Sequence, residues 1–148
     1  MLRCDDVGMH LTQIRLIVSD FSAMAAYYRD VIGLAPQYAE PSPPYAAFTP
    51  AHGSSLCLHE RADLAGVLGE TLAPAPTVPA DTVMIALRVN DLAAYLDGLT
   101  TRGGQVLAGP VEFGGRIRSA YLRDPEHNLI EIQQWLQVRD GGEIPSAD

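Results

Sequence analysis

The segment Ile14–Leu34 reads "IRLIVSDFSAMAAYYRDVIGL", and its pattern decides the fold. An apolar run of alternating character at its start predicts a strand, and a helical pattern follows Asp20 and ends at Gly33. Asp is favoured at the start of a helix because its carboxylate accepts a backbone hydrogen bond there, and Gly is favoured just beyond the last turn. The segment therefore predicts a strand followed by a helix that Asp20 caps and that ends at Gly33.

The chain repeats this pattern once. The segment Ile85–Gln105, "IALRVNDLAAYLDGLTTRGGQ", follows at an offset of 71 residues, so Asp20 corresponds to Asp91 and Gly33 to Gly104. In both copies the apolar residues of the helix recur at the spacing of one buried stripe. They are Phe21, Met24, Ala25, Tyr28 and Ile32 in the first helix, and Leu92, Tyr95, Leu96 and Leu99 in the second.

Short strand-like runs follow each predicted helix. They lie near Pro36–Glu40, Tyr45–Thr49 and Ser54–Glu60 in the first copy, and near Gln105–Ala108, Ile117–Arg123 and Leu129–Gln137 in the second. Each half is therefore β-α-β-β-β. A helix covers one face of such a unit and leaves the other bare, so two units must combine to enclose the bare faces. The expected fold is α+β: two tandem modules form a curved mixed sheet around a cleft, with the helices outside.

The whole chain, residues 1–148, is predicted to be a single domain. Module one covers about residues 11–60 and module two about 82–137. The segment 61–81 is rich in Ala and Pro and is predicted to be an extended linker, and 138–148 is predicted to be a polar, frayed tail. A chain of this length buries a sizeable core without disulfides or metals.

Composition and charge exclude several classes of protein. Hydrophobic residues make up 47% of the chain and charged residues 19%, as in ordinary globular proteins. A net charge of -8 repels phosphate backbones, so we expect no nucleic-acid partner. No apolar run is long enough to span a bilayer, so we expect no membrane partner.

The start of the chain and the cysteines bear on its location. The first residues, "MLRCDDVGMH", lack the apolar core of a signal peptide. Cys4 and Cys57 fit neither a zinc spacing nor a disulfide framework. We therefore expect a cytoplasmic protein.

Alternation along the predicted strands assigns each side chain to one of two faces. The helix-facing row is Ile14, Leu16, Val18, Leu56, Leu58, Ile85, Leu87, Val89, Ala120, Leu122, Ile130 and Ile132. The cleft-facing row is Gln13, Arg15, Ile17, Ser55, Cys57, His59, Met84, Ala86, Arg88, Ser119, Tyr121, Arg123, Leu129, Glu131, Gln133 and Trp135. The carboxylate of Glu131, inside an otherwise apolar strand, is thus predicted to point into the cleft.

The cleft-facing row combines apolar walls with sparse polar groups, which is typical of a small-molecule pocket. The predicted ligand-binding residues are Gln13, Arg15, Cys57, His59, Met84, Arg88, Ser119, Tyr121, Glu131, Gln133 and Trp135. Trp135 and Tyr121 offer flat surfaces for a planar ligand. Two simpler interpretations remain open. Glu131 pairs with Arg15, because a buried carboxylate needs a partner, or Trp135 covers a dimer interface or the end of the module.

The duplicated halves, the stretch "VSDFSAMAAYYRDVIGL" and the hairpin "RDPEHNLIEI" together resemble the vicinal oxygen chelate superfamily. That superfamily includes glyoxalase I, extradiol dioxygenases, and the fosfomycin- and bleomycin-type resistance proteins. The resemblance covers about residues 11–137. It implies either a metal-free homodimeric protein of the bleomycin-resistance type, which sequesters a hydrophobic or aromatic metabolite or drug, or an enzyme of the isomerase, lyase or dioxygenase type.

The resemblance also places the family's metal ligands, in the first and last strands of each half, at Gln13, Cys57, Met84 and Glu131. A Met thioether is a poor ligand for the divalent metals of this family, and a thiolate at the second point departs from the family pattern. We therefore expect no cofactor and no catalytic metal. A divalent metal bound by Gln13, His59 and Glu131 is the remaining metal-dependent alternative.

If the protein is an enzyme, Glu131 is the expected general base, with His59 or Tyr121 as the acid. A desolvated carboxylate has a raised pKa, which suits proton abstraction next to a carbonyl. Proton abstraction next to a carbonyl produces an oxyanion, which most enzymes of the resembled family stabilise with a bound metal. In this chain Met84 stands at the position of one of the metal ligands. This replacement favours the binding protein over the enzyme.

Overall fold

The computed structural model describes residues 8–148. Cys4 and most of the segment on which the signal-peptide expectation rests lie outside the described residues. Among residues 8–148 no helix is long and apolar enough to cross a membrane.

Module one has the predicted strand–helix–strands order. Its elements are β1 (Gln13–Val18), α1 (Phe21–Ala26), a π-helical continuation of α1 (Tyr27–Ile32), β2 (Tyr45–Phe48) and β3 (Ser55–Glu60). The strands form a sheet in the order β1-β3-β2. β1 and β3 run parallel and β2 is antiparallel to β3, so the first strand of the module lies beside its last.

Module two repeats this topology. Its elements are β4 (Met84–Arg88), α3 (Leu92–Thr101), β5 (Ala108–Phe113), β6 (Ile117–Arg123) and β7 (Leu129–Trp135). The sheet order is β4-β7-β6-β5, and the first strand is again parallel to the last. The repeated strand order confirms the duplication that the sequence predicts.

The two helix starts occupy equivalent corners of the modules. Asp20 caps α1 and accepts a hydrogen bond from the N–H of Ala23 at 3.1 Å. Asp91 caps α3 and accepts one from the N–H of Ala94, also at 3.1 Å. Each Asp lies within three residues of the end of the first strand of its module, and the two positions are 71 residues apart.

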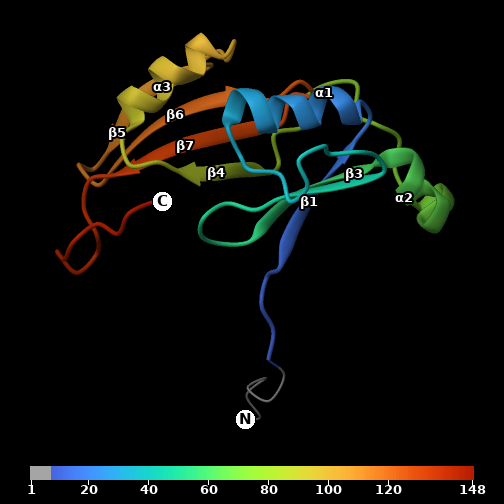
Figure 1. The fold of residues 1–148 in the computed structure, drawn as a ribbon, viewed down its shortest axis with the longest axis horizontal. Coiled ribbons are helices and arrows are strands. Elements are labelled where there is room, and N and C mark those ends of the chain that lie inside the picture. Colours follow the sequence, from blue (N-terminus) through green and yellow to red (C-terminus); the bar gives the residue numbers. More distant parts are fainter. Residues whose placement is uncertain (1–7) are drawn as a thin grey trace.

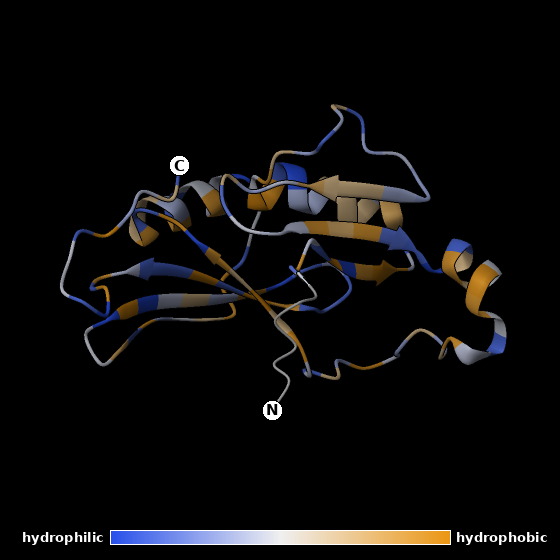
Figure 2. Ribbon diagram, turned by 90° about the horizontal axis from the view of Figure 1, so that it is seen from below, coloured by the Kyte–Doolittle hydropathy of each residue, from blue (hydrophilic) through white to orange (hydrophobic). Residues whose placement is uncertain are grey.

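Both helices lie on one side of the two sheets, and the chain leading into β1 projects away on the other side (Figure 1). The predicted stripe of α1 and its continuation is buried throughout, as are Leu92 and Leu99 of α3. The strand residues that face the helices bury most of the remaining core. In the view from below, hydrophobic stretches of the strands are interrupted by hydrophilic residues (Figure 2). An exception to the predicted burial is Ile14, which is 45% exposed.

The turn between β6 and β7, "DPEHN" at residues 124–128, ties module two to α1. Asp124 is 3% exposed, and its carboxylate accepts a hydrogen bond from the phenol of Tyr28 at 2.8 Å. It also accepts from the backbone and side-chain amides of Asn128 at 3.0 and 2.9 Å and from the N–H of Glu126 at 2.9 Å. Burial and the neighbouring carboxylate raise the pKa of Tyr28, so its phenol stays protonated and keeps donating.

Three segments differ from the expectation. The run Pro36–Glu40 forms only an isolated bridge, between Pro36 and Phe48, and the prolines at positions 36, 41, 43 and 44 have no N–H for a strand ladder. The first strand after α3 begins at Ala108 rather than ending there. The predicted extended linker contains a helix, α2 (Arg61–Leu68), followed by a 3-10 turn at Gly69–Thr71.

The predicted frayed tail is instead docked beside β4. The guanidinium of Arg88 donates to the carbonyls of Pro145 at 2.7 Å and Ser146 at 3.0 Å. The side-chain oxygen of Asn90 accepts from the N–H of Ala147 at 2.8 Å. Specific hydrogen bonds therefore hold residues 145–148, which we call the 145–148 segment.

Candidate functional site

The predicted site residues gather in two clusters, one on the helix-free face of each sheet. The module-one cluster contains Gln13, Arg15, Cys57 and His59, with Tyr45 and Asp63 added by the structure. The module-two cluster contains Ser119, Tyr121, Glu131, Gln133 and Trp135, with Arg88 beside it. No hydrogen bond or ion pair between described residues joins the two clusters. The two modules form separate sheets, in which β1 and β4 are edge strands.

A chain of hydrogen bonds runs along the module-two cluster. Tyr121 lies directly across from Glu131 in the β6–β7 register, and its phenol donates to the carboxylate at 2.7 Å. The other carboxylate oxygen accepts from the amide of Gln133, whose own oxygen accepts from the indole of Trp135 at 3.2 Å. The bond to Glu131 raises the pKa of Tyr121, which keeps the phenol neutral. The side chains are thereby held on one face in fixed orientations.

Glu131 has no cationic partner among the residues that the structure describes. It is 7% exposed, and both of its hydrogen bonds come from neutral groups. The guanidinium of Arg15 instead contacts His59 and lies 5.2 Å from the ring centre of Tyr45. The Glu131–Arg15 pair considered above is therefore not formed. A carboxylate offers about four acceptor positions, so Glu131 retains acceptor capacity for a bound group.

Ser119 is a second polar group with unused hydrogen-bonding capacity. Its hydroxyl is buried and has no hydrogen-bond partner of standard geometry in the described structure, although it lies near the phenol of Tyr121 and acts to lower the pKa of that phenol. It lies two residues before Tyr121 on the same face of β6, directly across from Gln133. An unpartnered buried hydroxyl costs stability unless something satisfies it, and native proteins contain few such groups.

The indole of Trp135 is covered on one face by the guanidinium of Arg88, which lies 4.5 Å from the ring centre. This contact is a cation–π interaction, and it fixes the plane of the indole. No aromatic ring within residues 8–148 stacks on Trp135. That Trp135 covers a dimer interface or the end of the module stays a prediction.

The polar side chains of the module-one cluster form hydrogen bonds with one another. The phenol of Tyr45 donates to the amide oxygen of Gln13 at 2.7 Å and lies 3.0 Å from the sulfur of Cys57. The thiol also donates to the Gln13 oxygen at 2.9 Å. Sequence reasoning left Tyr45 unplaced, although alternation along β2 puts it across from His59, on the face of the cluster.

His59 has both ring nitrogens engaged. An Arg15 N–H group lies 3.3 Å from Nδ1, and since arginine can only donate, Nδ1 is the acceptor. Nε2 then carries the proton and donates it to Asp63 at 2.7 Å. His59 is also only 8% exposed, so both of its nitrogens are held by the protein's own side chains. Asp63 lies in α2, where the sequence predicts a linker, so its role was missed.

The donor set does not fit a metal of the family type. Between residues 8 and 148, no group of three or more His, Cys, Asp or Glu side chains is placed to hold a metal ion. The alternative ligands Gln13 and His59 lie on one sheet and Glu131 on the other. The Gln13 oxygen already accepts two hydrogen bonds. Met84 lies at the edge of module two, 44% exposed.

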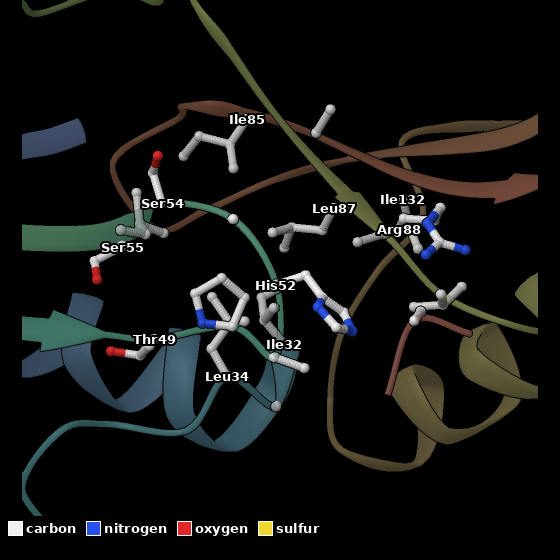
Figure 3. Close-up of a pocket in the computed structure, with 18 of the residues that line it drawn as sticks. Ile32, Leu34, Thr49, His52, Ser54, Ser55, Ile85, Leu87, Arg88 and Ile132 are labelled. Carbon is white, nitrogen blue, oxygen red and sulfur yellow. The ribbon is translucent and has the colours of Figure 1, made fainter. Parts of the chain in front are cut away.

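A cavity of about 570 Å³ lies between the modules (Figure 3). Ile85 and Leu87 of β4 line one side, Ile32 and Leu34 at the end of the first helix line the other, and His52 lies between them. Ile14, the exposed member of the helix-facing row, also contributes to its wall. Of the predicted ligand-binding residues only Met84 and Arg88 line this cavity. The cavity was not foreseen because much of its lining comes from loop residues 33–35 and 49–54, and several of its strand residues belong to the row assigned to the core.

Comparison with known proteins agrees with this architecture. Residues 10–132 match the model of the Glyoxalase/Bleomycin resistance protein/Dioxygenase superfamily. The uncharacterized protein YraH of Bacillus subtilis (strain 168) is 31% identical over 131 residues, which cover 86% of this chain and 100% of YraH.

Two solved structures share the fold. A glyoxalase/bleomycin resistance protein/dioxygenase from Nocardioides has a TM-score of 0.70 at 22% identity, with 94% of this chain and 91% of that chain covered. TnmS3, an antibiotic binding protein from Streptomyces sp. CB03234, has a TM-score of 0.62 at 24% identity, with 86% and 96% covered. At these identities the likeness concerns the fold alone.

Proposed function

Because the chain belongs to the Glyoxalase/Bleomycin resistance protein/Dioxygenase superfamily, we propose that it binds a planar, largely apolar small molecule on the module-two cluster, without a metal. The observation that carries the proposal is Glu131, a nearly buried carboxylate with neutral partners and unused acceptor positions. Such a group is costly to bury unless it serves a purpose. A ligand donor that binds it gains a strong hydrogen bond to a charged acceptor.

The chemistry of the cluster suggests the class of ligand. Trp135 and Tyr121 offer aromatic surface, and Glu131 offers a polar group that orients a ligand without covering it. Large apolar area with few polar groups is the usual composition of a small-molecule site. TnmS3, which shares the fold, is an antibiotic binding protein. A hydrophobic or aromatic metabolite or drug that the protein sequesters fits these features.

Trp135 provides the test, because it is the sole tryptophan of the chain. Titration with planar aromatic compounds, such as naphthoquinones and anthraquinones, is expected to quench or shift its emission in a saturable manner. The dissociation constant should be the same with and without a chelator, since the proposed site needs no metal. Free N-acetyltryptophanamide controls for absorption by the compounds. Absence of saturable change with every compound, or loss of binding on chelation, contradicts the proposal.

We also propose that the protein is a homodimer. A single chain leaves the helix-free faces of both modules open, and apolar residues such as Ile17 and Met84 are exposed there. A second copy that covers these faces removes apolar surface from water. Sedimentation equilibrium at micromolar concentration is expected to give twice the chain mass of 15.9 kDa. A single species at the mass of the monomer would refute the dimer.

An enzymatic function is the second candidate, and the Tyr121–Glu131 bond of 2.7 Å favours it. The two groups form a carboxylate and phenol pair, which could take a proton from a bound carbonyl compound and return one. In this candidate Tyr121 is the acid in preference to His59, because both nitrogens of His59 already have partners. The variants described in the Discussion separate binding from turnover.

A further inference from the structure

The cavity between the modules differs from the module-two cluster in position and in chemistry. Most of its strand residues belong to the helix-facing row, which points away from Glu131 and Trp135. Its walls are largely apolar and include Ile14, Ile32, Leu34, Leu56, Ile85 and Leu87. A volume of about 570 Å³ lies within the range of roughly 300–1,000 Å³ that is typical of small-molecule sites.

Arg88 is the charged residue that lines this cavity, and no Asp or Glu side chain shares the lining. Across residues 8–148, Arg88 forms no ion pair with a carboxylate. Its guanidinium is half-buried, and its hydrogen bonds go to two backbone carbonyls of the 145–148 segment. A positive charge beside an apolar cavity therefore has only neutral acceptors.

The geometry at Arg88 is that of a carboxylate site. Nη1 donates to the carbonyl of Pro145 at 2.7 Å and Nη2 to that of Ser146 at 3.0 Å. The two carbonyl oxygens thus occupy positions that the two oxygens of one carboxylate can take, because the guanidinium fork matches that group. Ala147 of the same segment forms part of the cavity wall.

The segment is held at the cavity by few contacts. The backbone oxygen of Asp148 contacts the ring of His52 at 2.9 Å, and Asn90 binds the N–H of Ala147. All of these contacts are exposed, so water competes for the same groups, and the Arg88 bonds end on neutral carbonyls instead of a charged acceptor. A ligand that offers a charged acceptor to Arg88 can displace them.

We propose that the cavity is a second binding site, which takes a small molecule with an apolar body and a carboxylate head group. Arg88 binds the carboxylate, β4 and the end of the first helix bury the apolar body, and the 145–148 segment occupies the head-group position when no ligand is bound. The cavity and the module-two cluster are different places, but both contact Arg88, whose guanidinium lies 4.5 Å from the ring centre of Trp135.

Octanoate is a suitable probe, with 1-octanol as the neutral-headed molecule of the same length. Calorimetric titration of the full chain is expected to show octanoate binding at least about tenfold tighter than 1-octanol, since hydrogen bonds to charged groups are the strong ones. Arg88→Gln should weaken octanoate binding about tenfold or more and leave 1-octanol unaffected. Arg118→Gln is the matched control, because Arg118 pairs with Glu112 on β5, away from the cavity lining.

The role of the 145–148 segment has its own test. Deletion of residues 145–148, or Asn90→Ala, is expected to tighten octanoate binding severalfold, because the internal competitor is removed or loosened. Arg88→Gln in the deletion background should abolish that gain. Circular dichroism checks that each variant is folded.

Three results would overturn the second site. They are the absence of octanoate binding in both the full and shortened chains, equal binding of octanoate and 1-octanol, and an unchanged octanoate affinity in folded Arg88→Gln. If Arg88→Gln alters the sedimentation of the protein but not its affinity for octanoate, the cavity is a contact between subunits and the proposal falls.

Discussion

Replacement of Asp124 by alanine is expected to lower the free energy of unfolding by about 3–4 kcal/mol, well above the usual cost of about 1 kcal/mol for a point substitution. The carboxylate is buried and accepts from Tyr28, Glu126 and Asn128. Its removal leaves a buried phenol and several amides without partners, and each unsatisfied group costs about 1–3 kcal/mol. The substitution also loosens the turn that sets the β6–β7 register.

Urea denaturation followed by far-ultraviolet circular dichroism measures this loss. Tyr28→Phe removes only the phenol bond of 2.8 Å, and we expect it to cost about 1 kcal/mol. Asp140→Ala is the matched control, since Asp140 is exposed and should change stability by less than about 0.5 kcal/mol. A loss of less than about 1 kcal/mol in Asp124→Ala would show that the turn does not depend on this carboxylate.

Trp135→Ala is expected to weaken binding of a planar ligand at the module-two cluster about tenfold or more. Loss of ring stacking costs about 0.5–1.5 kcal/mol beyond the buried area, and 1.4 kcal/mol corresponds to a factor of ten. Glu131→Gln should weaken binding less, because the amide retains an acceptor oxygen in the same place. Calorimetry is the measurement, since the variant lacks the fluorescent reporter.

Two controls sharpen the test. Trp135→Phe keeps a flat ring and should recover most of the affinity, and Tyr38→Ala removes an aromatic side chain that is 73% exposed, outside the cluster. If Glu131→Gln leaves binding intact but abolishes conversion of the ligand, the protein is an enzyme with Glu131 as its base. If neither Trp135→Ala nor Glu131→Gln changes the affinity, the module-two cluster is not the binding site.

Local patterns predicted much of the fold correctly. The duplicated strand, Asp cap and helix are present in both modules, because caps and apolar stripes act within a few residues of one another. Alternation correctly placed Tyr121 with Glu131 and Gln13 with Cys57, because side chains on a strand point to opposite faces in turn. Proline content could have warned against a strand at Pro36–Glu40, where the structure shows only a bridge.

Local patterns did not predict the contacts between segments that are far apart in the sequence. Whether Arg15 meets Glu131 depends on how the two sheets lie relative to each other, which no strand pattern encodes, and in the fold each finds partners in its own module. Docking of the 145–148 segment likewise depends on Arg88, which lies 57 residues earlier than Pro145. The repeat and the periodicity of the chain thus specify the two modules and the faces of their strands. Packing between elements far apart in sequence decides three features: the division of polar residues into two clusters, the cavity, and the position of the 145–148 segment. Each residue involved has several possible partners, and only the folded chain selects among them.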